Sequence, residues 1–397
     1  MPVSRRVAVL LLLLLCLAPS LRAAEISVDF EGGRILEATE ADRPWHPASL
    51  TKLMTAYLVF EALALGYLQW DQELTVSQAA GSQPEVALGL HQGQKITVGK
   101  AVEAMLMRSA NDAAVVLAEA VDGTEEAFAE RMTATARRLG MTRSSFVNAS
   151  GLPDDRQITT ARDMAILART LLLDLPQRYG LFSRRGFNYG SSWLANINGI
   201  LNSLAGADGL KTGFTCKSGY NLVVSAKRAG RRIIAVVLGA RSQGERRQEA
   251  TQLVERGFAS LDRLEREDLA PSRLAQFGAP LVPADPEPLE AGEETPPTVL
   301  SPADCAYGAA PRLARGPWSV HVGNFRTYGL ASRKMTSLRR LTSSLGFSQQ
   351  RITKAKNAGA NRYHARFANL TRSEAQRACQ SLRSKGQYCR VLAPGAK

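Results

Sequence analysis

The chain has 397 residues, of which 22% are charged and 45% hydrophobic, and its formal net charge is +14. This composition excludes a fibrous protein and a chain that is disordered throughout, and the length suggests two or three domains. The charge is unevenly spread. Residues 312–397 hold 18 Lys and Arg and one acid, whereas the other 311 residues hold 32 basic and 35 acidic residues, a net charge of −3. The basicity therefore belongs to a C-terminal region.

The first 24 residues have the pattern of a secretory signal peptide. Arg5 and Arg6 precede an apolar run over 7–17, and the small residues Ala23 and Ala24 follow it. The run is shorter than the ~20 residues that a membrane-spanning helix needs, so we expect cleavage near Ala23 or Ala24. The mature protein is then predicted to be exported and not transmembrane. Export permits disulfide bonds and argues against nucleic acid as the partner of the basic region.

Residues 25–264 mix helical and strand patterns without a repeat, which predicts an α+β fold with a helical cluster beside an antiparallel sheet. Apolar residues cover every face of the segment 49–65, as is typical of a buried helix. Two β-rich runs joined by a turn that contains Gly230 indicate a hairpin. The expected elements are helices over 49–65, 98–121, 161–173 (capped by Thr159 or Thr160) and 253–261, and strands over 220–226 and 232–239.

Residues 265–314 are predicted to be an extended linker. From Pro280 to Pro311 the chain holds eight prolines, six acidic residues and no basic residue, so it has too little apolar surface to fold. The basic region that follows, 315–397, shows the strand–helix–strand–helix–strand order of a small α+β domain. Its expected elements are strands over 318–325, 363–367 and 388–392, a helix carrying Leu338, Leu341 and Leu345, and a helix over 373–384.

The chain has five cysteines, of which Cys16 would leave with the signal peptide. The other four allow three pairings. Cys379 and Cys389 lie close together in the last domain, so we favour a disulfide between them. That pairing would leave Cys216 and Cys305 as free thiols.

The motif Ser49-Leu-Thr-Lys52 lies on the predicted buried helix. Residues three apart share one helix face, so Lys52 can reach the Ser49 hydroxyl. A serine needs an adjacent base to become a good nucleophile. A lysine can be that base where burial or a second cation lowers its pKa, and the apolar helix supplies the burial. Because this short pattern also arises by chance, it does not decide the function alone.

A second motif, Ser109-Ala-Asn111, lies between two helical stretches. A hydroxyl and a carboxamide two residues apart can both point into a cleft, where the hydroxyl can relay a proton and the amide can bind a peptide carbonyl. Ser and Asn are also common in ordinary caps and turns, so this motif is weak by itself.

A third motif, Lys211-Thr-Gly213, precedes the predicted hairpin. On an edge strand Lys211 would supply a fixed positive charge, and Thr212 a hydroxyl for a carboxylate. Gly213 would leave room for a substrate backbone. The alternative is that the motif has no function and is only the first part of a strand, with a solvent-exposed lysine.

Taken together, S-x-x-K, S-x-N and K-T-G in this order are the signature of penicillin-binding proteins and class A β-lactamases. The chain resembles the low-molecular-mass penicillin-binding proteins, the serine D-alanyl-D-alanine carboxypeptidases of the peptidase S11 type, across about residues 25–262. The resemblance implies a penicillin-binding/β-lactamase-like transpeptidase fold. It rests on the three motifs and on the segments 47–55, 108–114, 148–152, 160–164 and 211–222.

The resemblance also implies roles for single residues. Ser49 would attack the carbonyl between two D-alanines and form an acyl-enzyme, with Lys52 as general base. Ser109 would help to pass the proton to the leaving D-alanine. Water would then hydrolyse the ester.

A second group of residues is expected to bind the substrate. Asn111 would orient the substrate amide, while Lys211 and Thr212, with Arg241, would hold the terminal carboxylate. The backbone N–H groups of Ser49 and Phe214 would form the oxyanion hole. Relatives can have His at this position. If only the N–H acts, Phe214 is harmless, but any role of a polar side chain here is lost.

Three alternatives remain beside a carboxypeptidase. A β-lactamase of class A needs a further glutamate to activate water, and the chain has no Glu-x-x-Leu-Asn segment between the second and third motifs. β-Lactams are therefore expected to acylate Ser49 and stay bound. Endopeptidase action on cross-links uses the same chemistry, and a non-catalytic peptidoglycan-binding scaffold is possible on the same fold.

The C-terminal domain resembles a SPOR domain, through residues 318–325, 363–367 and 375–389. That resemblance implies binding to peptidoglycan glycan strands and enrichment at the division septum. Such strands carry carboxylates, so a strongly basic surface would attract them. The expected location is the periplasm. No metal or organic cofactor is expected, because Ser, Lys and backbone donors cover every role.

Overall fold

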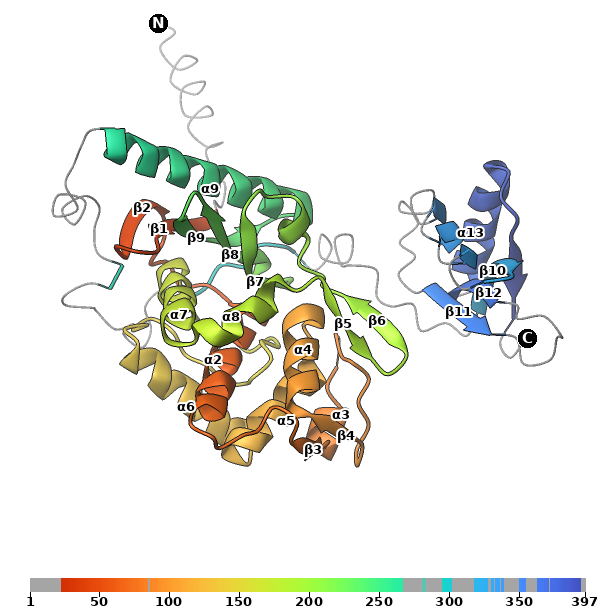
Figure 1. The fold of residues 1–397 in the computed structure, drawn as a ribbon, viewed down its shortest axis with the longest axis horizontal. Helices are drawn as coiled ribbons and strands as arrows, with labels where there is room; N and C mark the ends of the chain where they lie inside the picture. The colour runs from red at the N-terminus through yellow and green to blue at the C-terminus, as the bar shows by residue number, and fades with distance from the viewer. Residues whose placement is uncertain are drawn as a thin grey trace, which may run out of the picture. The chain divides into compact units, whose positions relative to one another are not determined.

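The structure, a computed structural model, divides into two compact units, Met1–Pro302 and Ala303–Lys397, here called the first unit and the second unit (Figure 1). Residues 1–22 of the predicted signal peptide, Cys305, Leu341 and Leu345 lie outside the described residues, whereas Ala24 begins the strand β1. No helix of the described residues is long and apolar enough to cross a membrane. The structure describes residues 23–84, 86–266, 281–282, 295–301, 318–327, 330–331, 333–335, 337–338, 350–354, 363–370 and 372–393.

The first unit is built on a five-stranded antiparallel sheet. The predicted hairpin is confirmed, and β8 and β9 are buried along most of their length. β7 lies at the edge of the sheet, which puts the Lys211 motif on an edge strand as expected. The strand order is β2 (Arg34–Thr39), β1 (Ala24–Asp29), β9 (Arg231–Ala240), β8 (Gly219–Arg228) and β7 (Ala207–Thr215).

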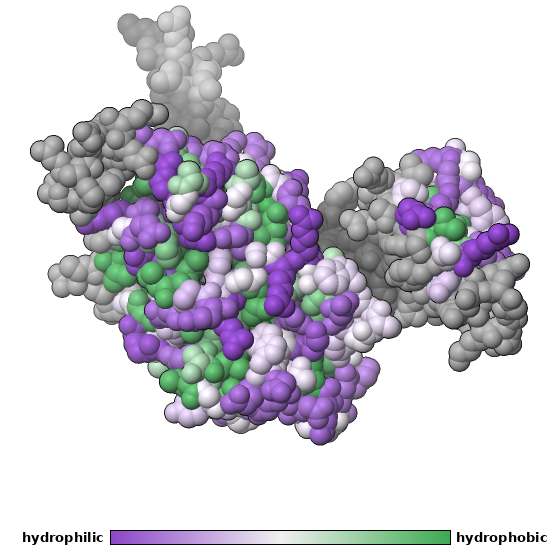
Figure 2. All heavy atoms as spheres, in the orientation of Figure 1, coloured by the Kyte–Doolittle hydropathy of each residue, from purple (hydrophilic) through white to green (hydrophobic). Residues whose placement is uncertain are grey.

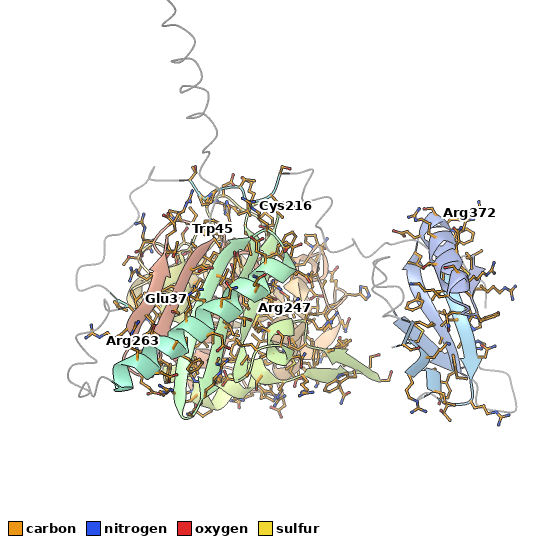
Figure 3. All side chains as sticks on the ribbon, turned by 90° about the horizontal axis from the view of Figure 1, so that it is seen from above. Glu37, Trp45, Cys216, Arg247, Arg263 and Arg372 are labelled. Carbon is orange, nitrogen blue, oxygen red and sulfur yellow. A yellow bond between two sulfur atoms is a disulfide. The ribbon has the colours of Figure 1, made fainter. Side chains whose placement is uncertain are left out.

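Helices cover both faces of this sheet. α9 (Gln243–Arg266) crosses β9, β1 and β8 (Figures 1 and 3), and α7 (Ala161–Asp174) packs against β9 and β1. The Thr160 hydroxyl accepts a hydrogen bond from the Asp163 N–H and so caps α7, as expected. The predicted helix over 253–261 is much shorter than α9, because the first turns of α9 are polar and give no apolar pattern.

The helical cluster surrounds α2 (Lys52–Ala64), in which the residues from Lys52 to Phe60 are all buried. The helix predicted over 98–121 is two helices, α4 (Val98–Arg108) and α5 (Asn111–Asp122), because Ser109 takes a left-handed backbone conformation with φ 62°. The cluster also contains α6 (Glu125–Arg138) and α8 (Pro176–Ser183).

Smaller elements complete the first unit. A 3-10 helix, η1, precedes α2, and two two-stranded sheets, β3 with β4 and β5 with β6, lie outside the main sheet. On the face shown in Figure 2, hydrophilic residues surround separate hydrophobic patches. These elements are η1 (Ala48–Thr51), β3 (Glu73–Thr75), α3 (Gln78–Gly81), β4 (Lys95–Thr97), β5 (Gly186–Tyr189), β6 (Ser192–Ala195) and η2 (Gly199–Asn202).

Parts of the expected linker dock on the first unit. Leu281 and Leu300 are buried in that unit. The Leu281 N–H donates to the Gly33 carbonyl (3.1 Å), and the Leu300 N–H donates to the Cys216 carbonyl (3.1 Å). Composition alone does not show this docking, and the helix α9 takes in the first two linker residues, because it ends at Arg266. The other residues of 267–314 lie outside the described residues.

The second unit contains a four-stranded antiparallel sheet in the order β11 (Gln350–Lys354), β12 (Tyr363–Leu370), β10 (Trp318–Phe325) and β13 (Arg390–Leu392). α13 (Arg372–Ser384) packs on it and buries Ala378 and Leu382. The strand β11 was not predicted, because Ile352 is its single apolar residue and one apolar residue gives no strand pattern. Leu338 is helical and buried, as expected.

One predicted disulfide is present and one predicted free thiol is not. Cys379 and Cys389 are bonded, with their Cα atoms 5.4 Å apart. Cys216 is also disulfide-bonded, so the expectation of a free thiol there was wrong. Sequence spacing does not fix which cysteines pair.

Candidate active site

The structure places Ser49 and Lys52 side by side where η1 passes into α2. Ser49 is partly exposed, whereas Lys52 is fully buried. The Lys52 Nζ lies 3.1 Å from the Ser49 Oγ. One-turn spacing produces this contact, because the side chain three residues on lies over the same face. The pair has the geometry of a nucleophile beside its base.

Two further groups orient the Lys52 amine. Its Nζ donates to the Asn111 Oδ1 at 2.7 Å and to the Ser150 carbonyl. As an ammonium, Lys52 has three donors, which Ser49, Asn111 and Ser150 together can accept. As a neutral amine, it keeps two donors for Asn111 and Ser150 and can turn its lone pair to the Ser49 hydroxyl. Sequence analysis predicted Asn111 near the site but missed Ser150, because a backbone carbonyl carries no motif.

The loop that contains Ser150 is pressed against η1. Gly151 has φ +84°, and a Cβ built there would lie 1.9 Å from the Ala48 carbonyl oxygen. Any side chain at this position would therefore push the loop away from Ser49. This contact explains why a glycine follows the serine that holds Lys52.

Ser109 and Lys211 form a second pair. The left-handed conformation of Ser109 ends α4 and lets α5 begin at Asn111. The Lys211 Nζ donates to the Ser109 Oγ at 2.9 Å and to the Thr212 carbonyl at 2.9 Å. The second and third motifs thus meet through a lysine–serine contact at the edge of the sheet.

Lys211 is a buried cation with a second cation nearby. It is 2% exposed, and burial first, then the charge of Arg246, lowers its pKa to about 7. Burial also lowers the pKa of Arg246 to about 10. Two desolvated cations close together favour an anion between or beside them, so this end of the site is suited to a carboxylate.

Arg241 stays the predicted carboxylate-binding arginine, and the structure adds a second arginine, Arg246, whose charge acts on Lys211. Arg241 is exposed, and its backbone N–H donates to Glu245. Arg246 lies one helical turn further on, in α9, with its guanidinium 5.7 Å from the centre of the Tyr220 ring. No local pattern singles out Arg246, because α9 brings it over the sheet only in the folded protein.

The strand β7 comes very close to η1 at Gly213. A Cβ at this residue would lie 3.0 Å from the Pro47 carbonyl and 3.1 Å from the Ser49 N. The predicted oxyanion donors, the N–H groups of Ser49 and Phe214, are therefore on two adjacent backbone segments. The Phe214 ring packs on Tyr220, with centroids 4.2 Å apart. Thr212 is partly exposed on the same strand.

Among the described residues, no group of three or more His, Cys, Asp or Glu side chains is placed to hold a metal ion. Ser49 Oγ contacts the Lys52 amine, which in turn contacts the Asn111 carboxamide and the Ser150 carbonyl. This donor set is suited to proton transfer and amide binding.

The sequence of residues 18–242 matches the D-alanyl-D-alanine carboxypeptidase family, peptidase S11. The chain belongs to this family. It is 36% identical over 249 residues to the D-alanyl-D-alanine carboxypeptidase DacC of Escherichia coli, covering 61% of this chain and 62% of that protein. The match thus spans less than two thirds of that relative's length.

Solved structures of penicillin-binding proteins have the same fold. Penicillin-binding protein 5 from Haemophilus influenzae is 33% identical, with a TM-score of 0.58 over 60% of this chain and 71% of that chain. Penicillin-binding protein D2 from Listeria monocytogenes, in its cefotaxime-bound form, is 35% identical, with a TM-score of 0.56 over 60% and 97%. The first unit therefore has the transpeptidase fold that the motifs predicted.

Proposed function

We propose that the protein is a serine-type D-Ala-D-Ala carboxypeptidase that removes the terminal D-alanine from peptidoglycan stem peptides. The observation that carries this proposal is the meeting of three motifs at one edge strand. Ser49 contacts Lys52 (3.1 Å), and Ser109 contacts Lys211 (2.9 Å). A nucleophile with its base and a proton relay beside a cationic pocket are what this hydrolysis needs.

The acylation step follows from these contacts. Neutral Lys52 takes the Ser49 proton while Ser49 Oγ bonds to the carbonyl carbon between the two D-alanines. The oxyanion accepts hydrogen bonds from the N–H groups of Ser49 and Phe214, each worth about 3 kcal/mol. When the tetrahedral intermediate collapses, the C–N bond breaks. Ser109 donates its hydroxyl proton to the leaving amine and regains one from the Lys52 ammonium, so that Lys52 is neutral again and D-alanine departs.

The terminal carboxylate defines where the substrate ends. Lys211, Thr212 and Arg241 are expected to hold this carboxylate, with Arg246 as a further cation near Lys211. A bound carboxylate would offset the cost of burying Lys211. Water then attacks the Ser49 ester with Lys52 again as base, which releases the shortened peptide. The same serine makes β-lactams covalent inhibitors, and relatives are known in cefotaxime- and ampicillin-bound forms.

The second unit is proposed to be a SPOR domain that holds the enzyme on glycan strands in the periplasm, enriched at the septum. Support comes from the charge of 312–397 and from exposed cations on α13 and β13, among them Arg377, Arg383 and Arg390. Carboxylate-bearing glycans would be attracted to this surface. Tethering raises the local concentration of the enzyme at its substrate.

The proposal is tested by incubating the protein with a D-Ala-D-Ala-terminated muropeptide and measuring free D-alanine, with Ser49→Ala as control. Release by the wild type alone supports a carboxypeptidase. Labelling by fluorescent penicillin without release indicates another substrate, for which a cross-linked dimer is the next assay. Absence of both release and labelling contradicts the enzyme and leaves a wall-binding scaffold.

Septal enrichment is tested separately, by imaging a fluorescent fusion with and without residues 315–397. Loss of the septal signal on deletion supports the SPOR assignment. An unchanged signal contradicts it, since the first unit alone would then determine location.

A further inference from the structure

Residues 295–301, which belong to the proline-rich stretch expected to be a linker, lie on the turn between β7 and β8. The Val299 N–H donates to the Lys217 carbonyl (3.0 Å), and the Leu300 N–H donates to the Cys216 carbonyl (3.1 Å). Leu300 is 8% exposed. Two consecutive backbone hydrogen bonds and a buried leucine are the contacts of a docked segment rather than of a free tether.

The side chains fit the turn as closely as the backbone does. Gly219 begins β8 with φ +65°, and a Cβ built on it would lie 2.7 Å from Val299 Cγ1. Val299 therefore occupies the space that a side chain at position 219 would need. The turn and the segment are complementary in shape.

Two features of the sequence favour this docking. Pro296 and Pro297 restrict the backbone just before the hydrogen-bonded residues, which reduces the conformational entropy lost when the segment docks. Cys216, whose carbonyl accepts from Leu300, is itself disulfide-bonded and is labelled in Figure 3. The same turn is thus held by hydrogen bonds, by apolar burial and by a covalent bond.

This turn borders the candidate active site. It follows directly after Phe214, the predicted oxyanion donor. Lys217 of the turn forms an ion pair with Asp155 (2.5 Å). Thr215 and Lys217 also line a pocket together with Ala48, the neighbour of Ser49. A shift of the turn would therefore move both the end of β7 and one wall of the space beside Ser49.

We propose that residues 295–301 form a strap that fixes the β7–β8 turn, and that Val299 and Leu300 are positioning residues for the reaction at Ser49. The inference rests on the proposed function. The strap touches no reacting atom and acts through the turn, by holding the Phe214 N–H within hydrogen-bond distance of the position that the oxyanion will occupy. A misplacement of about 1 Å in such a site can cost about 10²-fold in rate.

The test compares two full-length variants that carry the same substitution on neighbouring residues. Leu300→Asp places a carboxylate at the buried position, whereas Thr298→Asp places it on an exposed residue of the same segment. A third variant, Leu300→Met, keeps an apolar side chain of similar volume. The measurements are the rate constant for acylation by fluorescent penicillin, kcat and KM for D-alanine release, and hydrogen exchange at residues 214–219.

We expect Leu300→Asp to lower the acylation rate constant and kcat by tenfold or more and to speed exchange at 214–219. Thr298→Asp and Leu300→Met should stay within about twofold of the wild type. Thermal unfolding of each variant shows whether it is folded at the assay temperature, so that a loss from global unfolding is recognised.

Two results would contradict the proposal that residues 295–301 act as a strap. The first is a Leu300→Asp variant that is acylated at the wild-type rate although its amides at 214–219 exchange faster. The turn would then be more mobile without any effect on the reaction. The second is a loss of acylation that equals the loss of folded protein. If the wild type itself neither binds penicillin nor releases D-alanine, the proposed function fails. The exchange data then still decide whether the strap holds the turn.

Discussion

The two units of the protein use positive charge in opposite ways. In the first unit, Lys52 and Lys211 are 0% and 2% exposed, and each donates hydrogen bonds to specific partners. In the second unit, cations such as Arg372, Arg377 and Arg383 lie exposed on α13. The first arrangement suits chemistry at fixed atoms, and the second suits attraction to an extended anionic surface.

This difference determines how each unit should respond to change. A buried charge is costly unless it is paired, so a small change near Lys52 or Lys211 should be felt strongly. Exposed charges act together and are screened over a Debye length of about 8 Å at physiological ionic strength. Single changes in the second unit should therefore matter less than single changes in the first.

The largest effect is expected for Lys52→Met, which removes the amine beside Ser49 Oγ. Loss of a general base should slow penicillin acylation by about 10²–10⁴-fold, measured as the rate of fluorescent labelling. Lys95→Met is the matched control, because Lys95 is exposed and forms a surface ion pair with Glu73. Labelling of Lys52→Met at more than a tenth of the wild-type rate would rule out this role.

A second comparison uses two glycines with left-handed backbones. Gly151→Ala should destabilise the first unit by about 3 kcal/mol, through backbone strain and a clash with Ala48. Gly123 has φ +81° with open space around it, so Gly123→Ala should cost only the strain of about 1 kcal/mol. Urea unfolding measures both free energies. Equal values would mean that the loop relaxes away from η1 without cost.

In the second unit, the informative change is the double variant Cys379→Ser and Cys389→Ser. Removing a disulfide that closes a short loop should cost about 2–3 kcal/mol, so the amides of α13 should exchange faster. D-alanine release by the first unit should stay unchanged. A fall in that release would show that the two units are energetically coupled. It would contradict the view that each unit responds to changes independently.

The smallest predicted effect is the uptake of a proton by Lys211 when the substrate binds. With a pKa of about 7, Lys211 is mostly neutral at pH 8, and a bound carboxylate favours its charged form. Binding of a D-Ala-D-Ala peptide to the Ser49→Ala variant should therefore take up a fraction of a proton at pH 8. At pH 6 Lys211 is already charged, so uptake should be much smaller.

Calorimetry in buffers of different ionisation enthalpy measures this uptake. Adding Lys211→Arg should abolish it, because arginine stays charged at both pH values. Uptake that persists in the arginine variant would assign the proton to another group.

The contact between Ser49 and Lys52 was predictable because its cause is local, whereas the contact between Ser109 and Lys211 joins residues 102 apart in the sequence and was not predicted. Spacing of three residues places Lys52 beside Ser49, and the hairpin register of β8 and β9 leaves β7 at the edge. Arg246 was not predictable, because α9 brings it to Lys211 from a distant part of the sequence. Arg241 was chosen for its place at the end of the hairpin, but it lies exposed there.

The composition of the predicted linker did not reveal that parts of it dock on the first unit. Eight prolines and six acids in 280–311 correctly indicate a segment that cannot fold alone. They say nothing of whether single residues such as Leu281 and Leu300 dock onto a domain that is already folded. Docking depends on the shape of the partner surface, which is a property of the tertiary structure.

The position of β7 at the end of the sheet has a consequence for solubility. An open strand edge invites strands of other proteins and so promotes aggregation. Here η1 passes so close that even a Cβ at Gly213 would meet the Pro47 carbonyl at 3.0 Å. An arriving strand carries side chains on both of its faces and would collide with η1. The contact between η1 and β7 therefore limits how far the sheet can be extended at this end of β7.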